Sequence, residues 1–284
     1  MRVPPQFVKM VTGFKECFVR QAILQNITEI DALHLFEMLP VDLRKSECFE
    51  DALTGLWRYD FGTPPITIPG GGLIIGTPHF QEVRVLVRVI QLACQVLQKD
   101  RLTQYVGRLA NKKKHPDVLA EFQPLMHRVK LHGIVNEVAG VGNKTIDWLI
   151  PDDEKPPLYI EVKSRIRDLI ESIESLQFAQ SLGVSDIPAP HHDPALMMRS
   201  TIEKFPVRSP DVALHCVWIA AHLKQESNET RNAFEQLEAG KLHVVIFGGW
   251  NKEASIIAKR PEDIETVTNR LNITPSDQFL FLRS

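Results

Sequence analysis

The stretch KTIDWLIPDDEKPPLYIEVKSR, residues 144–165, decides the fold that we expect for this chain. It contains two runs rich in β-branched, aromatic and apolar residues, separated by a segment with three prolines. This arrangement is typical of two strands joined by a turn. Successive side chains of a strand point to opposite faces, so Tyr159, Glu161 and Lys163 are expected to share one face. The apolar neighbours of Asp147 should point away from its carboxylate, which allows the two carboxylates to converge.

Carboxylates that converge in this way suit a hard divalent cation, because such ions prefer oxygen ligands. Asp147 and Glu161 are the expected side-chain ligands, and the backbone carbonyl of Val162, which lies between the key side chains, could complete the shell. Lys163 could orient or deprotonate a water molecule, or stabilise developing negative charge. The expected cofactor is Mg²⁺ or Mn²⁺.

Residues 145–165 resemble the PD-(D/E)XK, or restriction-endonuclease-like, nuclease superfamily. The matching positions are Asp147, a variable spacer, and then Glu161, Val162 and Lys163. The resemblance implies an α/β fold whose αβββαβ core has a mixed sheet flanked by helices, with the divalent metal at the carboxylates. It also implies hydrolysis of phosphodiester bonds, with DNA as the favoured substrate. It covers roughly residues 116–250 and leaves out the N-terminal third.

Members of this superfamily often take a further acid from the helix before the first strand. Glu121 occupies that place here and is the expected additional catalytic and metal-binding residue, with Glu137 in the first strand as the alternative. The chain departs from the pattern in that Ile146, not Pro, precedes Asp147. The helix expected after Lys163 also lacks the Gln and Tyr arrangement of the RecB-like branch, which favours an endonuclease over an exonuclease.

The elements around the motif follow from the spacing of apolar residues. A helix is expected from Pro116 to about Val129, because proline fits the first turn of a helix. Strands are expected at IVNEV, KTIDWLI and PLYIEVK. The remaining predicted elements are a helix at 165–182, a strand at 212–221, a helix at 225–239 and a strand at 242–247.

Upstream of the motif the pattern is helical. Apolar residues recur at helical spacing over 6–43, and again over 78–98 and on to Ala110. The segment 62–78 is dense in Gly and Pro and predicts a loop or a short hairpin. We therefore expect a mainly helical N-terminal region at 1–77 and a nuclease-like domain at 78–284.

A basic run is the candidate nucleic-acid contact. Residues 101–115 contain Arg101, Arg108, Lys112, Lys113 and Lys114 and no acidic residue. Together with Arg165 after the motif, Lys112, Lys113 and Lys114 are the expected phosphate contacts. The alternative is a solvated helix end, where cations offset the helix dipole.

The totals set the wider limits. The 284 residues carry a net charge of −2, with 44% hydrophobic and 24% charged residues, which is ordinary for a globular protein. We expect no membrane segment, no secretory signal, no disulfide and a cytoplasmic location. Cutting both strands of DNA with one centre per chain would favour a homodimer.

An ExK triplet alone is weak, since amphipathic edge strands also alternate charged and apolar residues. The rival functional reading is a non-catalytic module that binds nucleic acid or protein through a degenerate nuclease fold. Trp148 and Trp218 lie in predicted strands and are assigned to core packing. His215 is assigned to a partly buried polar position, without a ligand role.

Overall fold

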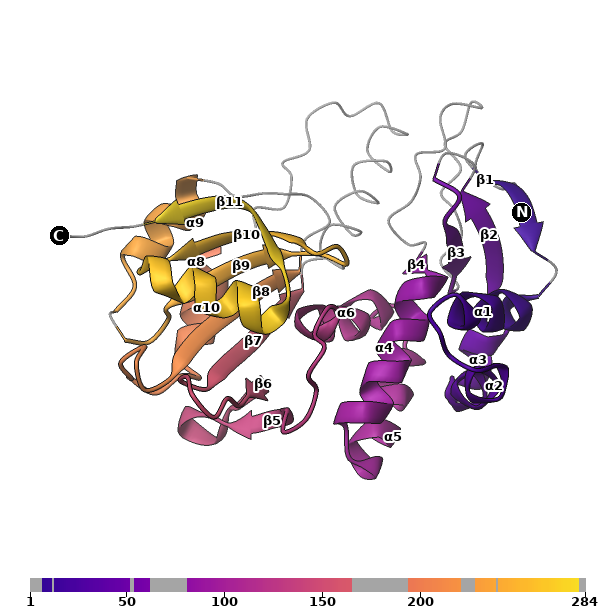
Figure 1. Ribbon diagram of the computed structural model, residues 1–284, viewed down its shortest axis with the longest axis horizontal. Coiled ribbons are helices and arrows are strands. Elements are labelled where there is room, and N and C mark those ends of the chain that lie inside the picture. Colours follow the sequence, from indigo (N-terminus) through magenta and orange to yellow (C-terminus); the bar gives the residue numbers. More distant parts are fainter. Residues whose placement is uncertain are drawn as a thin grey trace, which may run out of the picture. The chain divides into compact units, whose positions relative to one another are not determined.

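A computed structural model describes residues 7–11, 13–51, 54–61, 81–164, 194–220, 228–238 and 240–280. These residues form an α/β structure, which confirms the predicted class (Figure 1). They divide into two compact units. The first contains the described residues up to Cys94 and Gln98–Leu119, and the second contains Gln95–Leu97, 120–164 and those from residue 194 onward. No helix in the described part of the chain has the length and apolar character needed to cross a bilayer.

The first unit contains a four-stranded antiparallel sheet in the order β1-β2-β3-β4. Its strands are β1 (Phe7–Val11), β2 (Glu47–Asp51), β3 (Trp57–Asp60) and β4 (Gln81–Glu82). The expectation of helix from residue 6 is therefore wrong for β1. The short run FVKMV fits a helical period as well as an extended one, and pairing with β2 decides in favour of the strand.

The other regular elements in the described part of the first unit are helices, as the apolar spacing predicted. They are α1 (Phe14–Ile23), α2 (Glu29–Met38), α3 (Val41–Arg44), α4 (Val83–Val96), α5 (Lys99–Leu109) and α6 (His115–Ala120). Phe14, Phe18 and Phe36 form an aromatic cluster that also includes Tyr59 of the sheet. Most of α4 is buried, which explains its nearly continuous apolar sequence.

The predicted helix from Pro116 to Val129 is shorter than expected. α6 ends at Ala120, and a 3₁₀ turn, η1 (Gln123–Leu125), follows it. Pro124 explains the break, because a proline inside a helix lacks an N–H and clashes with the carbonyl four residues earlier, here that of Ala120. Glu121 therefore lies just after the helix, not within it.

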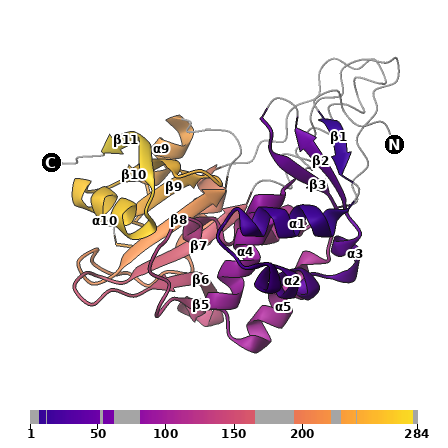
Figure 2. The ribbon, with the colours of Figure 1, turned by 45° about the vertical axis from the view of Figure 1, so that its right-hand side comes forward.

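The second unit is built on a seven-stranded mixed sheet in the order β11-β10-β9-β8-β7-β6-β5 (Figure 2). Neighbours β5–β6, β6–β7 and β9–β10 are antiparallel, whereas β7–β8, β8–β9 and β10–β11 are parallel. The strands are β5 (Val135–Ala139), β6 (Thr145–Ile150), β7 (Leu158–Ser164), β8 (Leu214–Ala220), β9 (Val244–Gly248), β10 (Glu253–Ala258) and β11 (Thr274–Leu280).

Helices α8 (Pro194–Ile202) and α9 (Asn228–Glu235) contribute Met198 and Phe234 to a buried cluster with Val217 and Val245 of the sheet. The other elements of this unit are α10 (Pro261–Leu271) and the 3₁₀ turn η2 (Val141–Asn143). The predicted strands at β5 to β9 and the helix α9 are confirmed in place. In this unit α8, β10, α10 and β11 were not predicted, and in the first unit β2, β3 and β4 were not predicted either. The predicted helix at 165–182 lies outside the described residues.

Candidate functional site

The ExK triplet lies on an interior strand of the sheet. β7 pairs with β6 on one side and with β8 on the other. The reading of Glu161 and Lys163 as part of an amphipathic edge strand is therefore wrong. An interior strand has less access to water, so a charged residue on it needs a partner within the protein.

Asp147 is bonded to the strand that carries the triplet. The paired residues of β6 and β7 end at Trp148 and Ile160. Beyond that point the backbone N–H of Val162 donates a hydrogen bond to Oδ2 of Asp147 at 2.7 Å. The Asp147 carboxylate thus accepts the Val162 N–H, which a backbone carbonyl would accept in regular strand pairing.

The pKa of Asp147 reflects its burial and the charges of two other carboxylates. Burial raises the pKa of Asp147 to about 7, and the negative charges of Glu161 and Glu121 act in the same direction. The hydrogen bond from Val162 and the charge of Lys204 oppose this rise in pKa. Asp147 therefore lies within electrostatic reach of both predicted acidic partners, as the convergence of the two strands requires.

Glu161 is the most buried member of the group, with 2% of its surface exposed. Its Oε1 accepts hydrogen bonds from Nζ of Lys163 at 2.8 Å and from Nζ of Lys204 at 2.5 Å. Its Oε2 is buried and has no hydrogen-bond partner among the described residues. A buried carboxylate oxygen without a partner is costly, and it marks a position that a cation would stabilise.

Lys204 is the site residue that the sequence did not reveal. It follows α8, 43 residues after Glu161, and no feature of the motif points to that position. Its backbone is held on both sides: its N–H donates to the Thr201 carbonyl at 3.0 Å, and its carbonyl accepts from Val141 at 2.9 Å. Gly140 permits this approach, because a Cβ there would lie 2.6 Å from the Lys204 carbonyl oxygen.

Glu121 is held near the site by a tryptophan. The indole Nε1 of Trp148 donates a hydrogen bond to the Glu121 carbonyl at 2.8 Å, and the Trp148 ring contacts Phe122 edge-to-face. The alternative acid, Glu137, has a φ of 52°, a left-handed conformation that is rare for a residue with a side chain. The backbone of β5 is thus distorted beside Asp147, whose carbonyl accepts from the Asn136 side chain at 3.0 Å.

The four residues predicted to contact phosphate are not all in the same part of the chain as the carboxylates. Lys112, Lys113 and Lys114 are exposed and lie between α5 and α6, and Nζ of Lys112 is 5.7 Å from the centre of the Phe61 ring. They belong to the first unit, whereas the carboxylates belong to the second. Arg165 lies outside the described residues. These four positions remain predicted contacts.

The acidic side chains of the site limit how a metal ion could be held. The described part of the chain contains no group of three or more His, Cys, Asp or Glu side chains that could hold one. Mg²⁺, however, usually keeps several waters and takes only one or two protein carboxylates. Oε2 of Glu161, unpartnered among the described residues, offers a ligand oxygen, and a cation would offset the Glu161 charge that, after burial, raises the pKa of Asp147. Asp147 and Glu161 fit an ion bound in that way.

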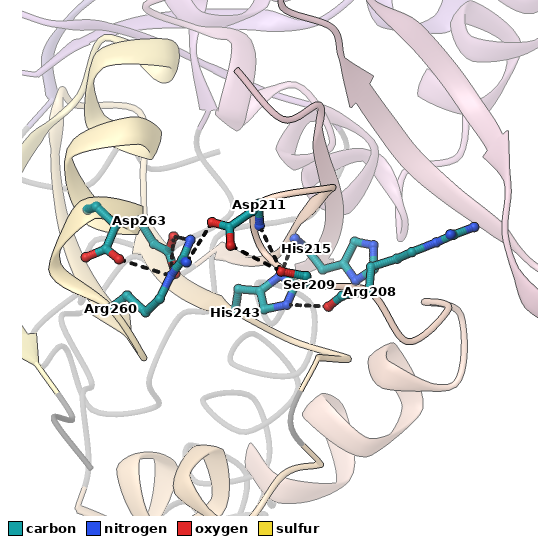
Figure 3. A network of polar contacts seen from close by, with 8 residues as sticks. Arg208, Ser209, Asp211, His215, His243, Arg260 and Asp263 are labelled. Atoms are coloured by element: carbon teal, nitrogen blue, oxygen red, sulfur yellow. Dashed lines mark hydrogen bonds and ion pairs between the residues drawn. The ribbon is translucent and has the colours of Figure 1, made fainter. Parts of the chain in front are cut away.

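A second polar network in the same unit binds side chains to backbone groups (Figure 3). The His215 backbone N–H donates to Nδ1 of His243 at 2.9 Å, and Nε2 of His243 donates to the Arg208 carbonyl at 3.2 Å. Nδ1 of His215 donates to the Lys241 carbonyl at 3.1 Å, and its ring stacks on Phe205. The imidazoles thus bind backbone groups, and His215, predicted to be a partly buried polar residue, is 1% exposed.

The fold and site together define an α/β protein with a cluster of acidic and lysine side chains on adjacent strands of a mixed sheet. The chain has no significant match to a protein-family model, to a curated protein or to a solved structure.

Proposed function

We propose that the second unit is a divalent-metal-dependent phosphodiesterase of the restriction-endonuclease-like class and that its substrate is DNA. The main supporting observation is that Lys163 donates to Glu161 at 2.8 Å and that the Glu161 charge helps to raise the pKa of Asp147 on the neighbouring strand. The order β5, β6, β7 followed by the parallel strand β8 supports the same class.

In this proposal Asp147 and Glu161 would hold Mg²⁺ or Mn²⁺ directly, with the Val162 carbonyl as a further ligand. Glu121, the third predicted acid, would act through its charge beside Asp147. The ion, when bound, supplies neutralisation of the charge that develops on the phosphate and lowers the pKa of the attacking water. Lys163 orients that water or stabilises negative charge at its Nζ. Val162 has a second role, because its N–H fixes the orientation of the Asp147 carboxylate.

Substrate binding is assigned to basic residues outside the carboxylate cluster. Lys112, Lys113, Lys114 and Arg165 would neutralise backbone phosphates, which gives affinity without sequence specificity. Exposure of the three lysines supports this assignment. Binding should weaken steeply as the salt concentration rises.

Plasmid cleavage tests the proposal directly. The purified protein with Mn²⁺ or Mg²⁺ should nick or linearise supercoiled DNA, and Asp147→Ala and Lys163→Ala should each lose about 100-fold or more in rate. Asp153→Ala is the matched control, because Asp153 is an exposed acid between β6 and β7. Single-stranded DNA and RNA, run in parallel, define the substrate. Absence of cleavage on all of them with either ion would overturn the proposal.

The alternative is a metal-free binding module, and one observation favours it: two ammonium groups already neutralise Glu161. Such a module would bind nucleic acid equally well with a chelator as with Mn²⁺, and Asp147→Ala would bind like the wild type. Retained binding without any cleavage would support this reading.

A further inference from the structure

Two lysines from distant parts of the chain meet on one oxygen of Glu161. Lys163 is two residues away on the same strand, whereas Lys204 arrives from the turn after α8 and makes the shorter contact, at 2.5 Å. Both ammonium groups bind Oε1, and Oε2 is left without a partner among the described residues. The carboxylate is therefore neutralised from one side only.

The Lys204 side chain can leave Glu161 while its backbone stays in place. The backbone is fixed by bonds to Thr201 and Val141 and by the close approach of Gly140. The side chain, in contrast, is a flexible four-carbon stem with 22% of its surface exposed. A change of rotamer towards solvent would release Oε1 without any change in the fold.

We propose that Lys204 is a built-in counter-ion of Glu161 that an incoming divalent cation displaces, so that Lys204 sets the cation affinity of the site. This inference rests on the proposed function in one respect, since it takes the Asp147–Glu161 pair as the cation site. It adds a residue outside the PD-(D/E)XK motif that regulates that site.

The physical argument is a competition between two cations for the charge of one carboxylate, with the ion attracted to the unpartnered Oε2 and Lys204 held at Oε1. In the metal-free protein, removal of one ammonium group leaves the buried Glu161 less well compensated, which costs stability. With the ion bound, the same removal ends a repulsion between like charges at short distance. Loss of the Lys204 charge should therefore destabilise the metal-free protein and strengthen cation binding.

Calorimetric titration of the chelator-treated full chain with Mn²⁺ measures the affinity without reference to catalysis. Lys204→Met, which keeps the length of the side chain, should bind Mn²⁺ about tenfold more tightly than the wild type. Lys204→Arg keeps the charge and should stay within about twofold of the wild type. Lys144→Met is the matched control, because Lys144 bonds the neighbouring Glu203 at 2.5 Å and is exposed.

Thermal unfolding with and without Mn²⁺ gives a second reading. Lys204→Met should melt at a lower temperature than the wild type in chelator, and saturating Mn²⁺ should narrow that difference, because an ion that binds only the folded state stabilises it. If Lys204→Met does not fold in chelator, Lys204→Gln in the same titration provides the test. Unchanged or weaker Mn²⁺ binding in the neutral variants would overturn the inference, as would the absence of Mn²⁺ binding in all proteins.

The outcomes separate this inference from the proposed nuclease. If Lys204→Met binds Mn²⁺ more tightly but the protein cleaves no nucleic acid, the counter-ion role of Lys204 is supported and the proposed nuclease activity is contradicted. If the wild type shows metal-dependent cleavage but binds Mn²⁺ no more weakly than Lys204→Met, the nuclease activity is supported and the counter-ion role of Lys204 is contradicted.

Discussion

Oδ2 of Asp147 accepts a hydrogen bond at 2.7 Å from the backbone N–H of Val162, the residue between Glu161 and Lys163. This bond links the two halves of the motif across adjacent strands. It fixes the Asp147 carboxylate at the point where the backbone pairing of β6 and β7 ends. The accepting carboxyl group of Asp147 has its pKa raised to about 7, chiefly by burial and then by the charge of Glu161.

The raised pKa predicts how stability depends on pH at Asp147. The ordinary pKa of the group is 3.8, so between about pH 4 and pH 7 the unfolded chain loses a proton that the folded chain keeps. This carboxyl group therefore makes the protein less stable as pH rises through that window. Asp147→Asn lacks the effect and can still accept from Val162. Its stability relative to the wild type should rise by on the order of 2 kcal/mol from pH 5 to pH 8.

Urea unfolding in chelator at both pH values measures this difference. Asp153→Asn, at an exposed position, should show the same offset from the wild type at pH 5 and pH 8. An offset for Asp147→Asn that does not change with pH would show that Asp147 ionises normally in the folded protein.

The next prediction concerns two tryptophans that act as matched hydrogen-bond donors. Trp148 donates to the Glu121 carbonyl at 2.8 Å, and Trp218 donates to Oε1 of Gln123 at 2.9 Å. Replacement by Phe removes either bond and keeps an aromatic ring, so each variant should lose about 1 kcal/mol of stability. Only Trp148→Phe releases the segment at Glu121. It should weaken Mn²⁺ binding several-fold more than Trp218→Phe does, in the same calorimetric titration. Equal affinities would remove Glu121 from the cation site.

The same tryptophans show how far the sequence could be read. Their burial was predictable from their place in strands, and each is 1% exposed. Their hydrogen bonds were not, because the partners of Trp148 and Trp218 lie 27 and 95 residues away. The role of Lys204 was not predicted for the same reason, because Lys204 lies 43 residues after Glu161. Period and local spacing identify faces of elements, and contacts between distant segments depend on how the elements pack.

Two other differences between prediction and structure concern features that are visible in the sequence. Pro124 was visible in the sequence and ends the helix that was expected to reach Val129. β10 corresponds to the apolar run in EASIIA, whose last five residues are all buried, and such a short run between polar segments favours a buried strand. The convergence of Asp147 and Glu161 stays a prediction from strand alternation, and the Glu161 charge that helps to raise the pKa of Asp147 is consistent with it.

Acid sensitivity is predicted for the network of Figure 3. Burial lowers the pKa of His215 from 6.5 to about 4, and the neighbouring His243 adds to this shift. Between those values the unfolded chain takes up a proton that the folded chain does not, so stability falls as pH decreases from about 6.5 to 4. His215→Asn should show a decrease smaller by on the order of 2 kcal/mol over that range, measured by urea unfolding. Parallel decreases in both proteins would contradict the assignment.

Packing at Gly248 offers a test of the sheet that supports the site. A Cβ at Gly248 would lie 2.1 Å from Cζ2 of Trp218. Gly248→Ala should therefore cost about 3 kcal/mol through overpacking. Gly107→Ala is the control, because a Cβ within α5 meets nothing within 4 Å and should stabilise the helix by roughly 0.5–1 kcal/mol.

A double-mutant cycle assigns the cost at Gly248 to the indole ring. In a Trp218→Leu background the added methyl group no longer meets the ring, so Gly248→Ala should cost at least about 1 kcal/mol less than in the wild type. Additive losses would place the strain elsewhere. Because Trp218 bonds the side chain of Gln123 and Trp148 alone of the two bonds the Glu121 carbonyl, displacement of the Trp218 ring should leave the segment at Glu121 in place. Gly248→Ala should then lower stability and, like Gly107→Ala, leave the Mn²⁺ affinity unchanged.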